Sequence, residues 1–362
     1  MAANSPQGMV LRKLLLAAAA MLFAVGVGWP SVHFLRKSTK KPRQAPYGLQ
    51  LVDDGGRALG KAHGPLKIVF DPFTVYRLAP NQKTSHITIN EHGGRGAIPD
   101  GDAPVVAFLG GSACFGQELA NDEEVFTAVL TRTSPRGRWM NFGCPGYYSG
   151  QESSFYLHRL RALAPSVVVS VSGWNDVFDA VQGAPRRLGW EGFNATFFEI
   201  RDRLCEFHAG GGSGSLPPPE TNRVQAFERT CRTYIDNMID LDRIAKARGA
   251  KFLWVIQPEL GAKADRSQYE NDILAAWERH YRYSPAEFSG RFVELRRRAK
   301  AAAAEHGVAF LDVNESERWR RQHAVLFADP VHPNVDGHRV LAEVLAPAVE
   351  RVARRSTSAA AN

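Results

Sequence analysis

The chain has 362 residues, 44% of them hydrophobic and 23% charged, so it is long enough to bury a sizeable core and has the composition of an ordinary globular protein. Its formal net charge is +8 at pH 7, but no basic stripe interleaved with aromatic residues and no nucleic-acid motif accompanies that charge, and we expect no nucleic-acid partner. Part of the excess lies near the two chain ends, and we interpret it as a solvated surface or an attraction to anionic lipid or polysaccharide.

The N-terminus carries a membrane signal. Arg12 and Lys13 precede an apolar run over residues 14–35 that weakens after Trp29 and is followed at once by basic residues. We predict a transmembrane helix that serves as an uncleaved signal anchor, because no clean small-x-small cleavage site comes after it. The greater positive charge after the run would keep the main domain in the cytoplasm. A span with a short basic lead commonly exports the chain on its C-terminal side, and we expect an extracytoplasmic (periplasmic), anchored main domain.

Around this span the chain divides into further segments: a basic lead (1–13), a polar and basic linker (36–46), an N-terminal extension packed on the main domain (47–103), the main domain itself (104–354) and a disordered tail (355–362). The extension holds short strand-like pieces over residues 67–70 and 86–89, broken by Gly, Pro and Asn. These pieces are too few to indicate a separate domain.

Apolar strand-like runs alternate with helical patterns in the main domain. We expect strands over residues 104–109, 139–142, 166–172, 251–256 and 308–311, and helices over 123–133, 151–163, 224–248, 285–306 and 335–354. This alternation predicts an α/β fold with a parallel sheet covered on both faces. The motifs described below come after strands or before helices, which places them at the carboxyl edge of the sheet, where open α/β folds bind ligands.

The pattern lapses over a flexible insert at about residues 183–221, where Gly- and Pro-rich sequence at 210–219 has no packing capacity. The insert is either a lid over the site or a plain surface loop. Cys205 and Cys231 flank the Gly-rich stretch and could pair in an oxidising compartment. We interpret Cys114 and Cys144 as small packing residues. No cysteine spacing resembles a zinc site, and we expect no metal and no organic cofactor.

Four short motifs carry chemistry when they are taken together. They are GGS at 110–112, NFGCPG at 141–146, GWND at 173–176 and DPVHP at 329–333. Ser112 comes after a buried strand and two glycines that would expose its hydroxyl at a helix N-terminus. His332, in a stiff loop with Asp329 three residues before it, would act as the general base that Asp329 orients. The set supplies a nucleophile and its base for acyl transfer through a serine ester.

Two further residues could stabilise an oxyanion. Gly146 would offer a backbone N–H and Asn175 a side-chain amide. Each motif also has a simpler interpretation: Ser112 or Asn175 as a helix cap, Gly146 as a turn glycine, and Asp329 with His332 as helix-entry residues. The nearby aromatic residues Tyr147, Tyr148 and Trp174 are more often packing residues than sugar-stacking ones.

The ordered set Ser112, Gly146, Asn175 and His332 resembles the SGNH/GDSL hydrolase superfamily over about residues 104–350, and residues 76–96 resemble the leader of some membrane-anchored members. The resemblance implies a three-layer α/β/α sandwich with a mostly five-stranded parallel sheet (flavodoxin-like) and a Ser112/Asp329/His332 triad. It also implies an oxyanion hole formed by the N–H groups of Ser112 and Gly146 and the Asn175 side chain. One departure is Gly111, which stands where the family usually has Asp and raises the chance of an altered rate or of a degenerate site.

The leading hypothesis is therefore a membrane-anchored serine esterase that hydrolyses a small acyl ester, expected to be acetyl, on a small molecule or carbohydrate through an acyl-Ser112 intermediate. An O-acyltransferase acting on a polysaccharide with the same triad is the first alternative. A catalytically degenerate binding protein, for which Gly111 is the only support, is the second. The sequence does not indicate an oligomeric state.

Overall fold

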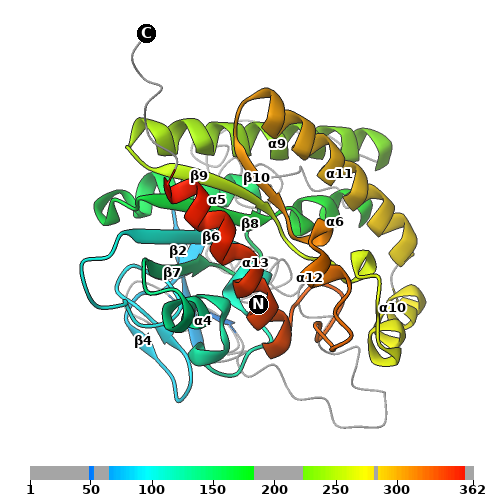
Figure 1. Ribbon diagram of the computed structural model, residues 1–362, viewed down its shortest axis with the longest axis horizontal. Helices are drawn as coiled ribbons and strands as arrows, with labels where there is room; N and C mark the ends of the chain where they lie inside the picture. Colours follow the sequence, from blue (N-terminus) through cyan, green and yellow to red (C-terminus); the bar gives the residue numbers. More distant parts are fainter. Residues whose placement is uncertain (1–48, 53–64, 183–222, 281–283, 355–362) are drawn as a thin grey trace, which may run out of the picture.

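The computed structural model describes residues 49–52, 65–182, 223–280 and 284–354 (Figure 1). The predicted basic lead, signal anchor at 14–35, linker, insert and tail lie outside these residues. Within the described ranges, no helix combines the length and hydropathy that a membrane span requires.

A five-stranded parallel sheet forms the centre of the molecule, as predicted. Its strand order is β10-β9-β8-β6-β7, and the strands are β6 (Val105–Gly110), β7 (Arg138–Gly143), β8 (Val167–Ser172), β9 (Lys251–Ile256) and β10 (Ala309–Asp312). The chain pairs β7 on one side of β6 and then crosses to build β8, β9 and β10 on the other. The strand order reverses beside β6, so the carboxyl end of β6 lies at the switch point where such sheets form a crevice.

Successive side chains along the strands pack alternately into two separate hydrophobic cores. In β6, Ala107 and Leu109 join one core, whereas Val106 and Phe108 join the other. The first core contains side chains of α5 (Ser149–Arg159), α6 (Trp174–Gln182), α9 (Arg223–Ala247) and α11 (Pro285–Glu305), and the second those of α4 (Phe126–Thr133), α12 (Glu317–Arg320) and α13 (Val335–Arg354). The sheet therefore lies between two helical layers, with α4 and α13 on the face toward the viewer in Figure 1.

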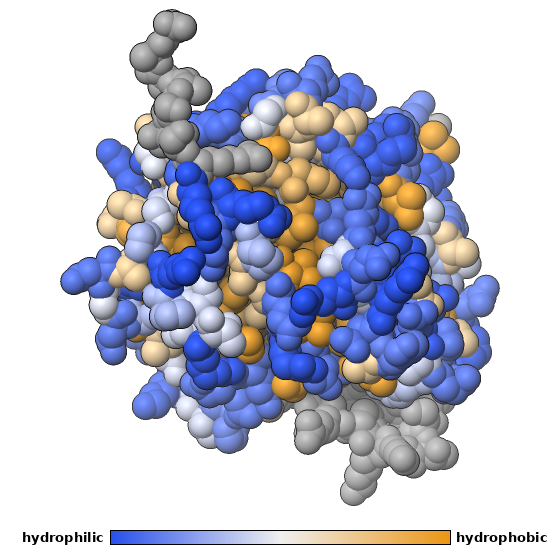
Figure 2. Space-filling model, viewed as in Figure 1, coloured by the Kyte–Doolittle hydropathy of each residue, from blue (hydrophilic) through white to orange (hydrophobic). Residues whose placement is uncertain are grey.

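That near face is mainly hydrophilic at its surface, with hydrophobic residues visible between the charged ones toward its middle (Figure 2). Its helices α4 and α13 line a groove of about 690 Å³ that includes Arg132, Arg339 and Glu350. Apolar side chains, including Val129, Ala342 and Ala346, line this groove between the charged ones.

The extension supplies two small sheets. One consists of β1 (Leu49–Val52), β2 (Leu66–Asp71) and β3 (Val75–Leu78), and the other of β4 (Gln82–Lys83) and β5 (Thr88–Ile89). Tyr76 on β3 donates its hydroxyl hydrogen to the carbonyl of Pro145 at 2.6 Å, and Tyr147 donates to the Tyr76 carbonyl at 2.7 Å. The extension thus contacts the main domain beside the predicted oxyanion glycine, Gly146.

Several elements differ from the sequence expectations. The helix expected over 123–133 is a 3₁₀ turn (Asp122–Glu124) followed by α4, and the one expected over 151–163 begins at Ser149, where the Gln151 side chain accepts the Tyr148 N–H. Neither α6 nor α10 (Gln268–His280) was predicted. Cys231 is buried, and Cys205, with which it could pair, lies outside the described residues.

Candidate active site

Ser112 is held at the carboxyl end of β6 by tight backbone contacts. A Cβ at Gly110 would meet the Val171 carbonyl oxygen at 2.5 Å, and one at Gly143 would meet the Phe115 nitrogen at 2.4 Å. Only glycine allows this approach, so the short helix α3 (Ser112–Phe115) rests directly on the sheet edge. Ser112 begins that helix, and the residue is 9% exposed.

The structure brings Ser112, His332 and Asp329 together. His332 Nε2 lies 2.7 Å from Ser112 Oγ, and His332 Nδ1 lies 2.6 Å from Asp329 Oδ2. The other oxygen of Asp329 accepts the backbone N–H groups of Val331 and His332, both at 2.8 Å. With Nδ1–H donating to Asp329, Nε2 is free to accept the serine proton, which is the arrangement of an activated nucleophile.

Charge and burial act against each other in this pair. Burial alone would raise the pKa of Asp329, but the charge of His332 and the backbone N–H groups hold it below its ordinary value. Burial alone would lower the pKa of His332, but the Asp329 carboxylate raises it above its ordinary value. The Asp329 carboxylate therefore stabilises the imidazolium that forms when His332 takes a proton.

The helix that follows the His332 loop is capped by Asn334 rather than by the two triad residues of the loop. Asn334 accepts the Gly337 N–H at 3.0 Å and donates its amide to the Val325 carbonyl at 2.9 Å. Asn334 thus caps the start of α13, so Asp329 and His332 do not act as helix-entry residues.

The predicted oxyanion donors lie around the nucleophile. Gly146 has φ +83°, and a Cβ there would meet the Tyr76 hydroxyl at 2.7 Å, so the turn requires glycine. Among the described residues, neither the Ser112 nor the Gly146 N–H has a hydrogen-bond acceptor. Asn175, in the first turn of α6, donates one amide hydrogen to the Tyr147 carbonyl at 2.9 Å. Its other amide hydrogen has no such acceptor, so three donors are available near Ser112.

Comparison with known proteins identifies the family of this chain. The sequence model of the GDSL-like lipase/acylhydrolase family matches residues 108–340. The chain belongs to this family. It is therefore a serine hydrolase that acts on ester bonds. A search of curated proteins finds no match.

Solved structures with a similar fold include three hydrolases. An acetylxylan esterase from Geobacillus stearothermophilus is 15% identical, and the match covers 69% of this chain and 95% of that chain with a TM-score of 0.41. An alpha/beta hydrolase from the metagenome of Lake Arreo, Spain, is 17% identical, with coverage of 69% and 98% and a TM-score of 0.40. A further acetyl xylan esterase is 15% identical, with coverage of 68% and 99% and a TM-score of 0.39.

In this acylhydrolase, the Asn175 side chain lies close against Gly111. A Cβ at position 111 would lie 2.6 Å from Asn175 Nδ2 and 3.2 Å from the Tyr147 carbonyl oxygen. The amide of Asn175 therefore occupies the space that a side chain at position 111 would need. In this chain the departure from the usual Asp goes together with a close approach of Asn175 to the residue before the nucleophile.

Sequence reasoning missed one acidic residue at the site. Glu118 has a carboxylate oxygen that lies, together with one Asp329 oxygen and one His332 nitrogen, in a group whose atoms are all within 4.8 Å of one another. Its Oε1 is buried and has no hydrogen-bond partner in the described part of the chain. Burial, and next the charge of Asp329, raise its pKa to about 7. Both nitrogens of His332 are already engaged, so we describe Glu118 as a neighbour of the triad rather than as part of a metal centre.

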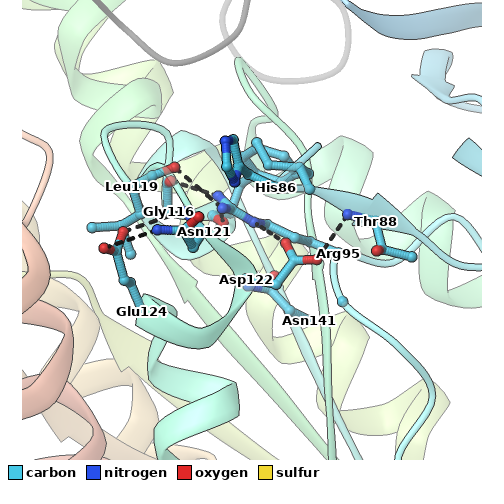
Figure 3. Close-up of polar contacts among 12 residues, drawn as sticks. His86, Thr88, Arg95, Gly116, Leu119, Asn121, Asp122, Glu124 and Asn141 are labelled. Carbon is cyan, nitrogen blue, oxygen red and sulfur yellow. Dashed lines mark hydrogen bonds and ion pairs between the residues drawn. The ribbon is translucent and has the colours of Figure 1, made fainter. Parts of the chain in front are cut away.

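Sequence reasoning also missed Arg95, a buried residue of the extension that holds the loop after α3 (Figure 3). Its guanidinium donates to three carbonyl groups and one carboxylate, those of Phe115 (3.2 Å), Gly116 (2.7 Å), Leu119 (3.2 Å) and Asp122 (3.0 Å). We call these contacts the Arg95 clamp. Asp122 in turn accepts the Thr88 N–H at 2.7 Å, so the clamp joins β5 to the loop after the nucleophile. A buried arginine that donates to three backbone carbonyl groups and one carboxylate is not evident from a sequence motif.

Proposed function

We propose that this acylhydrolase is a serine esterase that removes a small acyl group, expected to be acetyl, from a carbohydrate ester. The observation that carries the proposal is the hydrogen-bonded series Ser112–His332–Asp329, with 2.7 and 2.6 Å between successive polar atoms. A helix-capping serine and a loop histidine that served only structural roles would have no reason to meet at this distance across 220 residues of sequence.

In the proposed mechanism, Ser112 Oγ bonds to the ester carbonyl carbon while its proton moves to His332 Nε2. The negative charge that develops on the carbonyl oxygen is met by the N–H groups of Ser112 and Gly146 and by the Asn175 amide. The ester C–O bond then breaks, and the proton on Nε2 passes to the leaving alcohol oxygen. Water attacks the acyl-serine, gives a proton to His332, and releases the acid as Ser112 regains its proton.

The small size of the acyl group is proposed from the superfamily resemblance. The carbohydrate is proposed from the superfamily resemblance. Tyr147, Tyr148 and Trp174 do not contribute to that argument, since all three are buried, and Trp174 stacks on Phe178 with ring centroids 4.5 Å apart.

A serine-reactive probe tests the chemistry directly. The purified full-length chain would be treated with a fluorophosphonate, alongside Ser112→Ala and Ser153→Ala. Ser153 lies on α5, where its hydroxyl bonds to backbone carbonyls of Ser149 and Asn237. We expect labelling of the wild type and of the Ser153 variant and none of the Ser112 variant. A folded wild type that resists the probe would contradict the proposal and favour the binding-protein alternative.

Substrate class and reaction outcome need separate assays. Aryl acetate, butyrate and octanoate esters compared at equal concentration should give the highest kcat/KM for acetate. Release of free acetate from an acetylated oligosaccharide, with no acylated product when an unacetylated oligosaccharide is added, would support hydrolysis. A transferred acetyl group on the added oligosaccharide would instead support the O-acyltransferase alternative.

We also propose that the apolar run over residues 14–35 anchors the protein in a membrane with residues 47–354 outside the cytoplasm. The basic flanks on both sides of the run support an anchor. Recovery of the protein in the membrane fraction, with degradation by protease added outside the inner membrane, is expected. Protection from that protease would indicate the opposite orientation.

A further inference from the structure

Glu118 lies at a place that the fold fixes firmly. It is bracketed by Gly116 and Leu119, and the Arg95 clamp holds the carbonyl groups of both residues (Figure 3). The side chain of Arg95 is itself buried and ion-paired with Asp122 at 3.0 Å. The backbone at Glu118 is therefore held near the triad by contacts on both sides of it in the chain.

Groups from two other elements act on this carboxyl. The 329–333 loop brings Asp329, whose charge opposes ionisation of Glu118, and His332, whose charge favours it. Burial, and next the charges of both carboxylates, raise the pKa of Tyr269 on α10. Its hydroxyl donates to the Ala328 carbonyl at 3.4 Å. Arg95 directs its guanidinium to backbone carbonyls and Asp122. Among the described residues, the cation that acts on Glu118 is thus His332, when it is protonated.

The electrostatic environment of an ionised Glu118 differs between neutral and protonated His332. With His332 neutral, an ionised Glu118 has a buried oxygen without a hydrogen-bond partner and a second carboxylate nearby, which is unfavourable. With His332 protonated, the same carboxylate faces an opposite charge. The interaction is strongest in the state that forms as Ser112 attacks, and only such a differential interaction speeds the chemical step.

We propose that Glu118 is a positioning residue of this site and that its carboxylate strengthens His332 as the general base. The proposal rests on the proposed serine esterase function. It assigns a fourth titratable group to the site, beyond the Ser112, His332 and Asp329 that the family resemblance implies.

The test measures His332 itself and does not require turnover. The chain would be labelled with ¹³C at the histidine ring, and His332 would be assigned by the signal lost in His332→Asn. We expect Glu118→Gln to lower the pKa of His332 by about one unit, because an opposite charge within about 4–6 Å moves a pKa by one to three units. Glu123→Gln is the matched control, since Glu123 pairs with Arg132 on the surface. It should leave the pKa of His332 unchanged.

Turnover gives the second readout. At alkaline pH, Glu118→Gln should reduce kcat about tenfold with KM nearly unchanged, and the acid limb of its kcat/KM profile should move about one unit lower, as expected for a weaker base. Glu118→Asp keeps the charge and should restore most of both effects. It also serves as the informative variant if Glu118→Gln does not fold.

The outcomes separate the two proposals. An unchanged His332 pKa in folded Glu118→Gln, or a fall in kcat that is the same at every pH, would overturn the role of Glu118. If the wild type hydrolyses no ester but its His332 pKa still falls in Glu118→Gln, the electrostatic role stands and the proposed esterase function fails.

Discussion

Replacing Glu152 with Gln should change how the stability of this protein depends on pH. Glu152 on α5 is completely buried. Its Oε2 accepts the Ser170 hydroxyl at 2.6 Å, whereas Oε1 has no hydrogen-bond partner in the described structure. Burial, opposed in part by the Ser170 hydrogen bond and reinforced by the Asp176 carboxylate, raises the pKa of Glu152 to about 8 from an ordinary 4.5.

The polar groups beyond Ser170 point toward Glu152. Trp254 donates its ring N–H to the Tyr234 hydroxyl at 2.9 Å, that hydroxyl lies 3.4 Å from Ser172 Oγ, and Ser172 Oγ lies 2.9 Å from Ser170 Oγ. If each hydroxyl donates a hydrogen bond to the next oxygen in this series, the last acceptor is Oε2 of Glu152. The network can therefore satisfy one oxygen of Glu152, and the other is left to carry a proton.

The sign and magnitude come from proton linkage. Below about pH 4.5 the carboxyl is protonated in both states, and the folded state loses nothing. Between pH 4.5 and 8 the unfolded chain releases the proton while the folded chain keeps it, so stability falls as pH rises. A shift from 4.5 to about 8 corresponds to a loss of about 5 kcal/mol above pH 8, at about 1.4 kcal/mol per pKa unit.

Glutamine has the same shape and no titration, so Glu152→Gln should remove this slope. Its buried amide would itself lack a partner, which costs about 1–3 kcal/mol at all pH values. Urea unfolding at pH 5, 6.5 and 8.5 should therefore show the variant less stable than wild type at pH 5 and more stable at pH 8.5. Glu317→Gln, at an exposed position, controls for the loss of one charge. Parallel pH dependences of wild type and Glu152→Gln would refute the reasoning.

Three further predictions concern the active site. Asn175→Ala should lower kcat by about 10²–10³ with little change in KM, measured on an aryl acetate, because it removes one oxyanion donor. Gly111→Ala should lower kcat about tenfold, because the new Cβ would lie 2.6 Å from the Asn175 amide nitrogen and displace it. Gly111→Ala added to the Asn175→Ala variant should lower kcat little further, because the displaced amide is already absent. If the two effects on kcat are fully additive, the cause is not this steric displacement. Arg95→Gln should lower the free energy of unfolding by about 3 kcal/mol or more, because buried carbonyl groups lose their donor, and should slow fluorophosphonate labelling of Ser112; equal labelling rates would show that the clamp supports stability alone.

The central sheet could be predicted because its strands are continuous apolar runs. Residues 166–172 and 251–256 are such runs, and the structure places β8 and β9 there almost residue for residue. The GGS and NFGCPG motifs overlap the ends of β6 and β7, and GWND follows β8, so the meeting of these three at one sheet edge was also a consequence of the pattern. The DPVHP motif instead precedes α13. Residues from different segments converge there because parallel strands share that edge.

Other features depend on tertiary contacts that no local pattern records. Glu118 has no motif of its own, and its place beside His332 results from a loop held by Arg95, 23 positions earlier in the chain. The start of α6 was interpreted only as a cap at Asn175, whereas the helix is stabilised by Trp174 and Phe178 packing on Phe288 of α11. Such packing is decided by partners more than 100 residues away.

The Arg95 clamp has a consequence for where this enzyme can be divided. The family model begins its match at residue 108, and a chain cut just before β6 would keep Ser112, Gly146, Asn175, Asp329 and His332. It would lack the guanidinium that satisfies the carbonyl groups of Phe115, Gly116 and Leu119, directly after the nucleophile helix. The unit that folds around the nucleophile is therefore larger than the unit recognised by its motifs. A truncation guided by the motifs alone would remove a support of the site while leaving all its chemistry in place.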